Sequence, residues 1–161
     1  MGSNFGTYED VVKLLNEEGV EIEDMAVLVY DLQKPYVLNV TIEESCDSIK
    51  SVLSKREVIN TVMVGLELDR SARNRRMENK TLEKILIDDQ GLFGVDEVLA
   101  YTICNIYGSI ALTNFGYLDK IKPGIIGVIN NNHDRCNVFL DDIIGAIVAS
   151  AASRVAHRHD E

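Results

Sequence analysis

Apolar residues recur along the first third of the chain at the three- and four-residue spacing of amphipathic helices. Residues 8–18 carry such a face among charged side chains, and Gly19 follows it as a helix stop. Residues 22–33 carry a wider apolar face that ends at Lys34-Pro35, because the residue before a proline disfavours the helical conformation. The pattern therefore predicts two short helices near the N-terminus.

Two Ser/Thr-x-x-Glu patterns mark further helix beginnings. Thr41 with Glu44 predicts a capping box at the start of a helix over residues 42–53. Ser54 with Glu57 predicts a second capping box, followed by a longer helix. A polar surface loop is expected over residues 74–80, and Thr81 is expected to open a short helix that ends at Ile87.

The second half contains the most apolar stretch of the chain. Residues 95–112 are apolar on nearly every side, which is typical of a helix at the centre of a domain. Residues 98–118 contain no charged side chain and are long enough to span a bilayer, but their interspersed Thr, Asn and Ser residues favour a buried core helix. Glycines and a proline then interrupt the pattern over 114–127, and a last helix is predicted over 138–157, with Asn137 as its cap.

Length and composition agree with an all-α fold. The 161 residues, of which 46% are hydrophobic, predict a single domain over residues 1–161, with one central apolar helix surrounded by about five others. The net charge of −10 argues against nucleic acid as a partner, because such binding depends on clustered Lys and Arg. Cys46, Cys104 and Cys136 form no Cys-x-x-Cys pair, and residues 1–10 lack a signal-peptide pattern. We therefore expect a cytoplasmic protein with reduced thiols, and peripheral membrane association stays open.

Two acidic pairs are each followed by two apolar residues and one small residue. The pairs are Asp96-Glu97 and Asp141-Asp142, and the small residue after the second pair is Gly145. Positions three and four apart share one helix face, so four carboxylates converge if the two helices touch at their small residues. Carboxylates that close repel one another, and a bound divalent cation, either Mg²⁺ or Mn²⁺, would neutralise this repulsion. Acidic residues are also common in first helical turns, where they complement the helix dipole, and the pattern alone leaves both interpretations open.

Three segments carry a family resemblance. They are residues 91–97 (GLFGVDE), 114–123 (NFGYLDKIKP) and 139–146 (FLDDIIGA). Together and in this order they resemble the phosphatidylglycerophosphatase A family, and the chain is most similar to its soluble, low-temperature-requirement-C-like branch. The likeness to that branch extends from about Val20 to His157.

The resemblance implies an all-helical, Mg²⁺-dependent phosphomonoesterase that removes the terminal phosphate from phosphatidylglycerophosphate. It carries the acidic motif roles onto five residues, Asp96, Glu97, Asp119, Asp141 and Asp142, and a cationic role onto Lys122. The hypothesis is metal-assisted hydrolysis, in which the two acidic pairs hold one or two Mg²⁺ ions. Asp119 would act as general base, and Lys120, Lys122 and Arg135 would neutralise phosphate oxygens.

Two other functions stay open. Hydrolysis of soluble phosphates or nucleotides would use the same carboxylates, and Gly116 stands where membrane-bound members carry an arginine. A non-catalytic helical scaffold would use the acidic pairs only as helix caps. The expected partners are a phosphorylated small molecule or a lipid headgroup, and the apolar content predicts a homo-oligomer. His133 is interpreted as a residue of a polar surface loop.

Overall fold

The computed structural model describes residues 5–91 and 93–160, and this part of the chain forms nine α-helices and no strand. The helices are α1 (Tyr8–Glu17), α2 (Ile22–Gln33), α3 (Ile42–Leu53), α4 (Arg56–Arg73), α5 (Lys80–Ile87), α6 (Val95–Tyr107), α7 (Ser109–Ile121), α8 (Gly124–Asn130) and α9 (Leu140–His159). The all-α prediction is confirmed, and so are the helices expected in the first half of the chain. The motif residue Leu92 and the first four residues of the segment 1–10 lie outside the described residues.

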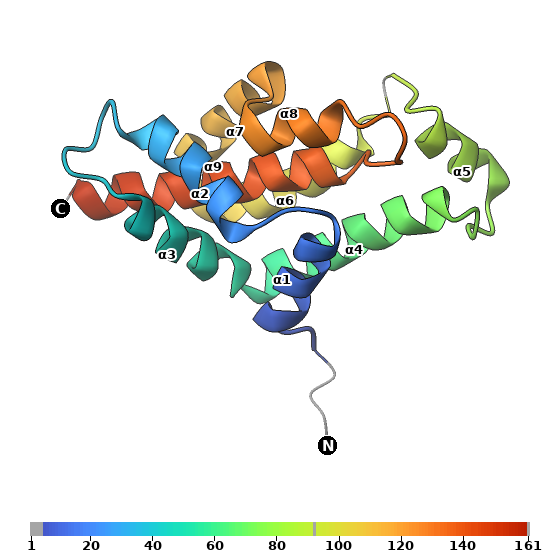
Figure 1. The fold of residues 1–161 in the computed structure, drawn as a ribbon, viewed down its shortest axis with the longest axis horizontal. Helices are drawn as coiled ribbons and strands as arrows, with labels where there is room; N and C mark the ends of the chain where they lie inside the picture. Colours follow the sequence, from blue (N-terminus) through green and yellow to red (C-terminus); the bar gives the residue numbers. More distant parts are fainter. Residues whose placement is uncertain (1–4, 92, 161) are drawn as a thin grey trace.

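The central helix is α9, which runs through the middle of the molecule (Figure 1) and contacts α2, α3, α4, α6, α7 and α8. Fifteen of its twenty residues are buried. Most of its middle section is alanine, serine or a branched aliphatic residue, and small side chains let several helices approach the same axis. The expectation that residues 95–112 form the central helix is therefore wrong.

The stretch expected to be one buried helix is instead two helices joined at Gly108. The backbone of Gly108 has φ 90°, a conformation that glycine adopts without a steric penalty. Ala100, Ile103 and Cys104 face the core, but Val98 is 62% exposed and other apolar residues of α6 and α7 also reach the surface. Among the described residues, no helix has the length and apolar character needed to cross a membrane.

Neither of the two predicted capping boxes forms completely. Thr41 Oγ1 accepts a hydrogen bond from Glu44 N at 3.0 Å, as expected, but the Glu44 carboxylate contacts His159 Nε2 at 2.8 Å and does not bond back to the Thr41 backbone. Ser54 is instead the C-terminal cap residue of α3, and its hydroxyl donates to Lys50 O at 2.7 Å. Helix α4 begins one residue later, with Lys55 at the N-cap position and no side-chain cap. The second capping box was wrong because the serine completes the preceding helix.

Close helix packing depends on Gly65 and not on Gly145. A Cβ atom at Gly65 of α4 would overlap Ile143 Cδ1 of α9 and would lie 3.3 Å from Phe139 Cβ. A Cβ atom at Gly145 would meet the ring of Phe115 at 3.5 Å, which is ordinary van der Waals contact. Gly65 therefore lets α4 pack against the start of α9.

Candidate active site

A cavity of about 350 Å³ opens where the N-terminal ends of α6 and α9 meet the C-terminal end of α7. Six acidic residues line it, namely Asp89, Asp96, Glu97, Asp119, Asp141 and Asp142. The end of α8 and the loop between α8 and α9 add polar side chains to its lining, namely Asn130, Asn132, His133, Arg135 and Asn137. The sequence placed both acidic pairs at helix beginnings, and the structure brings these two beginnings to one cavity.

Lys122 supplies a positive charge inside this acidic cavity. Its Nζ donates to Asp119 Oδ1 at 3.0 Å and to Asp141 Oδ2 at 3.2 Å. Burial opposes the charged form, but the hydrogen bond with Asp119 and the charge of Asp141 raise the pKa of Lys122. The ammonium group therefore stays protonated at neutral pH and joins the end of α7 to the start of α9.

The second acidic pair is buried, and burial changes its protonation. Burial raises the pKa of Asp141 to about 6, against the opposing charge of Lys122. Burial, the charge of Asp141 and contacts with Asp96 and Asp119 together raise the pKa of Asp142 to about 10. Asp142 therefore carries a proton at neutral pH in the metal-free protein, which relieves part of the repulsion between the carboxylates.

The start of α9 is capped by Asp69 of α4 and not by Asn137. Asp69 is fully buried, and its carboxylate accepts hydrogen bonds from Phe139 N at 3.0 Å and Leu140 N at 3.0 Å. Burial raises the pKa of Asp69 to about 7, against these two backbone donors. This side chain fixes the first turn of α9, which carries the second acidic pair. An acidic residue inside α4 gave no sequence signal for this role.

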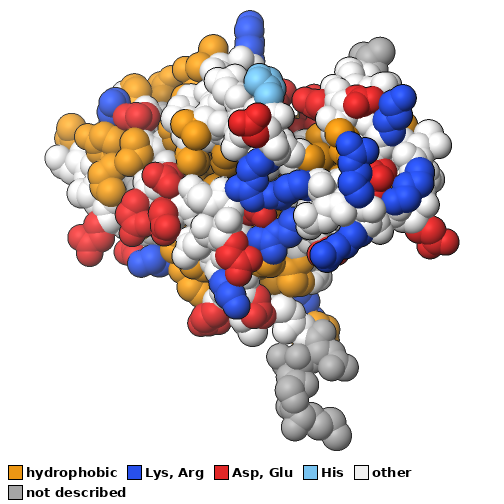
Figure 2. Space-filling view, turned by 45° about the vertical axis from the view of Figure 1, so that its right-hand side comes forward, with side chains coloured by type: hydrophobic (Ala, Val, Ile, Leu, Met, Phe, Trp, Pro, Cys, Tyr) orange, Lys and Arg blue, Asp and Glu red, His pale blue; other side chains and the backbone are white. Residues whose placement is uncertain are grey.

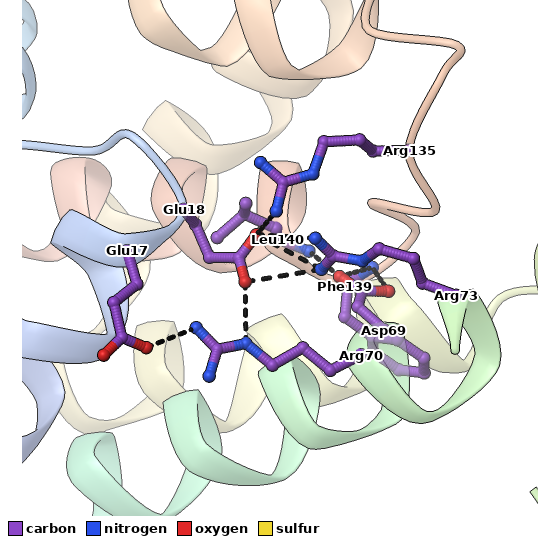
Figure 3. A network of polar contacts seen from close by, with 8 residues as sticks. All are labelled: Glu17, Glu18, Asp69, Arg70, Arg73, Arg135, Phe139 and Leu140. Carbon is purple, nitrogen blue, oxygen red and sulfur yellow. Dashed lines mark hydrogen bonds and ion pairs between the residues drawn. The ribbon is translucent and has the colours of Figure 1, made fainter. Parts of the chain in front are cut away.

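Arg135 reaches the cavity while its guanidinium is held by a buried carboxylate from the other end of the chain. Glu18 Oε2 accepts from Arg135 Nη2 at 3.1 Å, and the same carboxylate binds Arg70 and Arg73 of α4 (Figure 3). Burial alone would raise the pKa of Glu18, but the hydrogen bond from Arg70 and the charges of Arg73 and Arg135 lower it.

Figure 2 shows Lys and Arg side chains gathered on the face where α5 lies, so the negative net charge is unevenly spread.

The remaining predicted site residue lies elsewhere. Lys120 is exposed on α7 and does not line the cavity. His133, interpreted from sequence as a surface residue, is exposed and also lines the cavity. The sequence analysis did not assign Asp89 or the asparagines at 130, 132 and 137 to the site, although Asp89 shortly precedes the first acidic pair and the asparagines shortly precede the second.

The donor set suits a hard divalent cation. The lining offers carboxylate and amide oxygens, the ligands that Mg²⁺ and Mn²⁺ prefer. Asn137 Oδ1 is buried and has no hydrogen-bond partner, so a bound cation or its water would satisfy it. Within residues 5–91 and 93–160, no three His, Cys, Asp or Glu side chains already stand in a metal-binding arrangement. Protonated Asp142 and the Lys122 ammonium instead compensate the charge of the cavity.

Comparison with known proteins decides the family. Residues 23–157 match the family model described as phosphatidylglycerophosphatase A. The chain belongs to the phosphatidylglycerophosphatase A family. The match covers every residue of the acidic cavity.

Relatives place the chain within this family. It is 50% identical over 145 residues to the uncharacterized protein YutG of Bacillus subtilis (strain 168), covering 89% of this chain and 87% of YutG. A low temperature requirement C protein from Listeria monocytogenes has a similar crystal structure, with TM-score 0.91, 45% identity and coverage of 96% and 97% of the two chains. A protein of unknown function from Bacillus stearothermophilus gives TM-score 0.90, 47% identity and 94% coverage of both chains. The assignment to the low-temperature-requirement-C-like branch is confirmed.

Proposed function

We propose that this protein is a Mg²⁺-dependent phosphomonoesterase that hydrolyses phosphatidylglycerophosphate to phosphatidylglycerol and phosphate. The observation that carries the proposal is the meeting of both acidic pairs, Asp119 and Lys122 in one solvent-reachable cavity. Acidic residues that served only as helix caps would not need to be buried side by side, as Asp141 and Asp142 are, because charge repulsion and desolvation both cost stability there. Family membership supports the reaction class.

The metal would be held by Asp96, Glu97, Asp141 and Asp142, with Mn²⁺ as an alternative to Mg²⁺. When bound, a divalent cation lowers the pKa of water and neutralises charge on a phosphoryl group. It would also supply the counter-charge that allows Asp142 to lose its proton.

The remaining charged residues act on the substrate. Lys122 is charged, and it lies between Asp119 and Asp141, where its ammonium group would neutralise phosphate oxygens. Asp119 is the residue of this cavity assigned to take a proton from the attacking water. Arg135 would contact the phosphate from the rim, and its salt bridge to Glu18 orients the guanidinium before substrate arrives.

The size of the cavity bears on the choice between lipid and soluble substrates. A volume of about 350 Å³ is at the lower end of ligand pockets and suits a phosphate group with a small alcohol. Acyl chains would remain outside it. A soluble phosphomonoester therefore fits the same cavity, and hydrolysis of soluble phosphates is the second candidate function.

The test is phosphate release from a panel of phosphomonoesters with and without lipid tails, each with Mg²⁺ and with EDTA. The proposal expects Mg²⁺-dependent release from phosphatidylglycerophosphate in detergent micelles, and loss of that release in Asp142→Asn. Asp88→Asn is the matched control, because Asp88 is exposed and lies outside the cavity lining. Release only from tail-free esters would select the second candidate. No release from any ester would leave the non-catalytic helical scaffold as the explanation. Equal release by Asp142→Asn and the wild type would instead overturn the role proposed for the acidic cavity.

Assembly and location are separate questions. The expected homo-oligomer stays a prediction, and light scattering would test it by comparing the solution mass with the 18.0 kDa of one chain. The cytoplasmic location also stays a prediction, which cell fractionation would test.

A further inference from the structure

A second cavity, of about 550 Å³, lies at the corner between α3 and α4, beside the start of α1. Figure 1 shows this corner below α9 and next to α1. Seven residues line it, namely Tyr8, Lys50, Ser51, Ser54, Lys55, Tyr107 and Arg154. We call it the basic cavity, because its lining contains three cationic side chains and no carboxylate.

The three cations of the basic cavity have no acidic partner. Among the described residues, no Asp or Glu lies within ion-pairing distance of Lys50, Lys55 or Arg154. Arg154 Nη1 donates only to the hydroxyl oxygen of Ser48, at 3.1 Å. Several other cations of the described chain also form no ion pair, but these three line one cavity that has no carboxylate in its lining.

Helix stabilisation explains only one of these cations. Lys50 lies in the last turn of α3, where a positive charge complements the helix dipole. Lys55 is the N-cap residue of α4, where a positive charge is unfavourable for the same reason. Its position beside Lys50 and Arg154 therefore works against helix stability, and an external anion would compensate it.

Neutral donors complete the lining. The Tyr107 hydroxyl is buried and has no hydrogen-bond partner. Burial raises the pKa of Tyr107, although the Arg154 charge opposes the shift, so the hydroxyl remains a donor at neutral pH. Glu57 is near enough to affect the pKa of Tyr107, but it does not line the cavity.

We propose that the basic cavity binds the phosphate group of a small ligand at a site separate from the acidic cavity. Lys50, Lys55 and Arg154 would supply the charge, and Ser51 and Tyr107 the neutral hydrogen bonds. Arg154 follows Asp142 by three helical turns of α9, which places the two cavities about 18 Å apart along this helix. The phosphate comes either from a free phosphorylated metabolite or from a lipid headgroup, and both present the same oxyanion.

The test measures binding of inorganic phosphate and glycerol 3-phosphate to the full chain by calorimetry in EDTA, where the acidic cavity repels anions. Lys50→Gln/Lys55→Gln is the main variant, since both lysines are exposed and unpaired. Its matched control is Lys13→Gln/Lys84→Gln, which removes two exposed lysines outside the cavity. A parallel arm uses phosphatidylcholine vesicles with and without phosphatidic acid, to separate the lipid source from the free one.

The proposal expects about tenfold weaker binding in Lys50→Gln/Lys55→Gln, on the scale of 1.4 kcal/mol for each factor of ten. The lysine control and Asp142→Asn should bind as the wild type does, and added salt should weaken binding throughout. Circular dichroism checks that each variant is folded. Wild-type protein that binds neither free phosphate nor phosphatidic acid vesicles would overturn the proposal. Equal binding by Lys50→Gln/Lys55→Gln would also overturn it, and neither result would affect the hydrolysis test above.

Discussion

Replacing Asp142 by asparagine separates the stability of the fold from the proposed metal site. In the metal-free protein the pKa of Asp142 is raised from 3.8 to about 10, mainly by burial and by the charge of Asp141. At pH 7 this side chain is protonated when folded and ionised when unfolded. Asparagine is neutral, has nearly the same shape, and its amide can still donate to Asp96 and Asp119.

The expected gain in stability follows from this difference in protonation. The ordinary pKa of 3.8 lies about three units below pH 7, and each unit corresponds to about 1.4 kcal/mol. Protonating Asp142 on folding at pH 7 therefore lowers the free energy of unfolding by at most about 4 kcal/mol. Asp142→Asn removes this cost. We therefore expect the metal-free variant to unfold at higher urea concentration than the wild type at pH 7. A residue that lowers stability at a site is typical of selection for function.

Urea unfolding in EDTA tests the expected gain in stability of the metal-free variant, and urea unfolding in Mg²⁺ tests the role of Asp142 as a metal ligand. The wild type should gain stability as Mg²⁺ is added, because the ion binds only the folded chain. Asp142→Asn should gain little, and the Asp88→Asn control should respond as the wild type does. A metal-free Asp142→Asn that is clearly less stable than the wild type would refute the protonation argument. An unchanged Mg²⁺ response in this variant would refute the role of Asp142 as a ligand.

Three further results are expected. The pKa values of Asp69 and Asp141 are raised to about 7 and about 6, so the folded state binds protons more tightly than the unfolded state. The stability of the metal-free protein should therefore be highest near pH 4 and fall as the pH rises through these pKa values. A urea midpoint that rises from pH 5 to pH 8 would contradict this expectation. Asp69→Ala should lower the free energy of unfolding by about 1–3 kcal/mol for each backbone N–H left without an acceptor, and Asp69→Asn should recover part of this loss. An Asp69→Ala variant that unfolds at the same urea concentration as the wild type would contradict the capping role. Gly65→Ala should destabilise by about 1–3 kcal/mol through overpacking, whereas Gly145→Ala should be neutral or stabilise by up to about 1 kcal/mol; the reverse order in denaturation would contradict the packing argument.

The periodic pattern predicted the helices well because each helix places one apolar face on a common core. The three- and four-residue spacing is a local property, and so are signals such as Gly19 after α1 and the Thr41 cap of α3. A local pattern also placed each acidic pair at the start of a helix, but the meeting of the two pairs depends on tertiary packing, which the sequence left open. The identity of the metal ligands remains a prediction.

Properties that depend on which helices pack together could not be predicted. Hydropathy favoured residues 95–112 as the centre, but α9 is central because its small side chains admit more neighbours. Asp69 lies inside α4, and only the tertiary arrangement directs it to the start of α9. The salt bridge from Lys122 to Asp141 spans two helices, so its effect on the charge of the cavity was likewise invisible in the sequence.

Anomalous diffraction from crystals soaked in Mn²⁺ would show whether the two acidic pairs hold a divalent cation, because it locates the ion without assuming any activity. We expect an anomalous peak in the acidic cavity, within bonding distance of carboxylates from both acidic pairs, and its loss in Asp142→Asn crystals. Crystals that take up Mn²⁺ only elsewhere, with Lys122 still bridging Asp119 and Asp141 in a metal-free cavity, would contradict it.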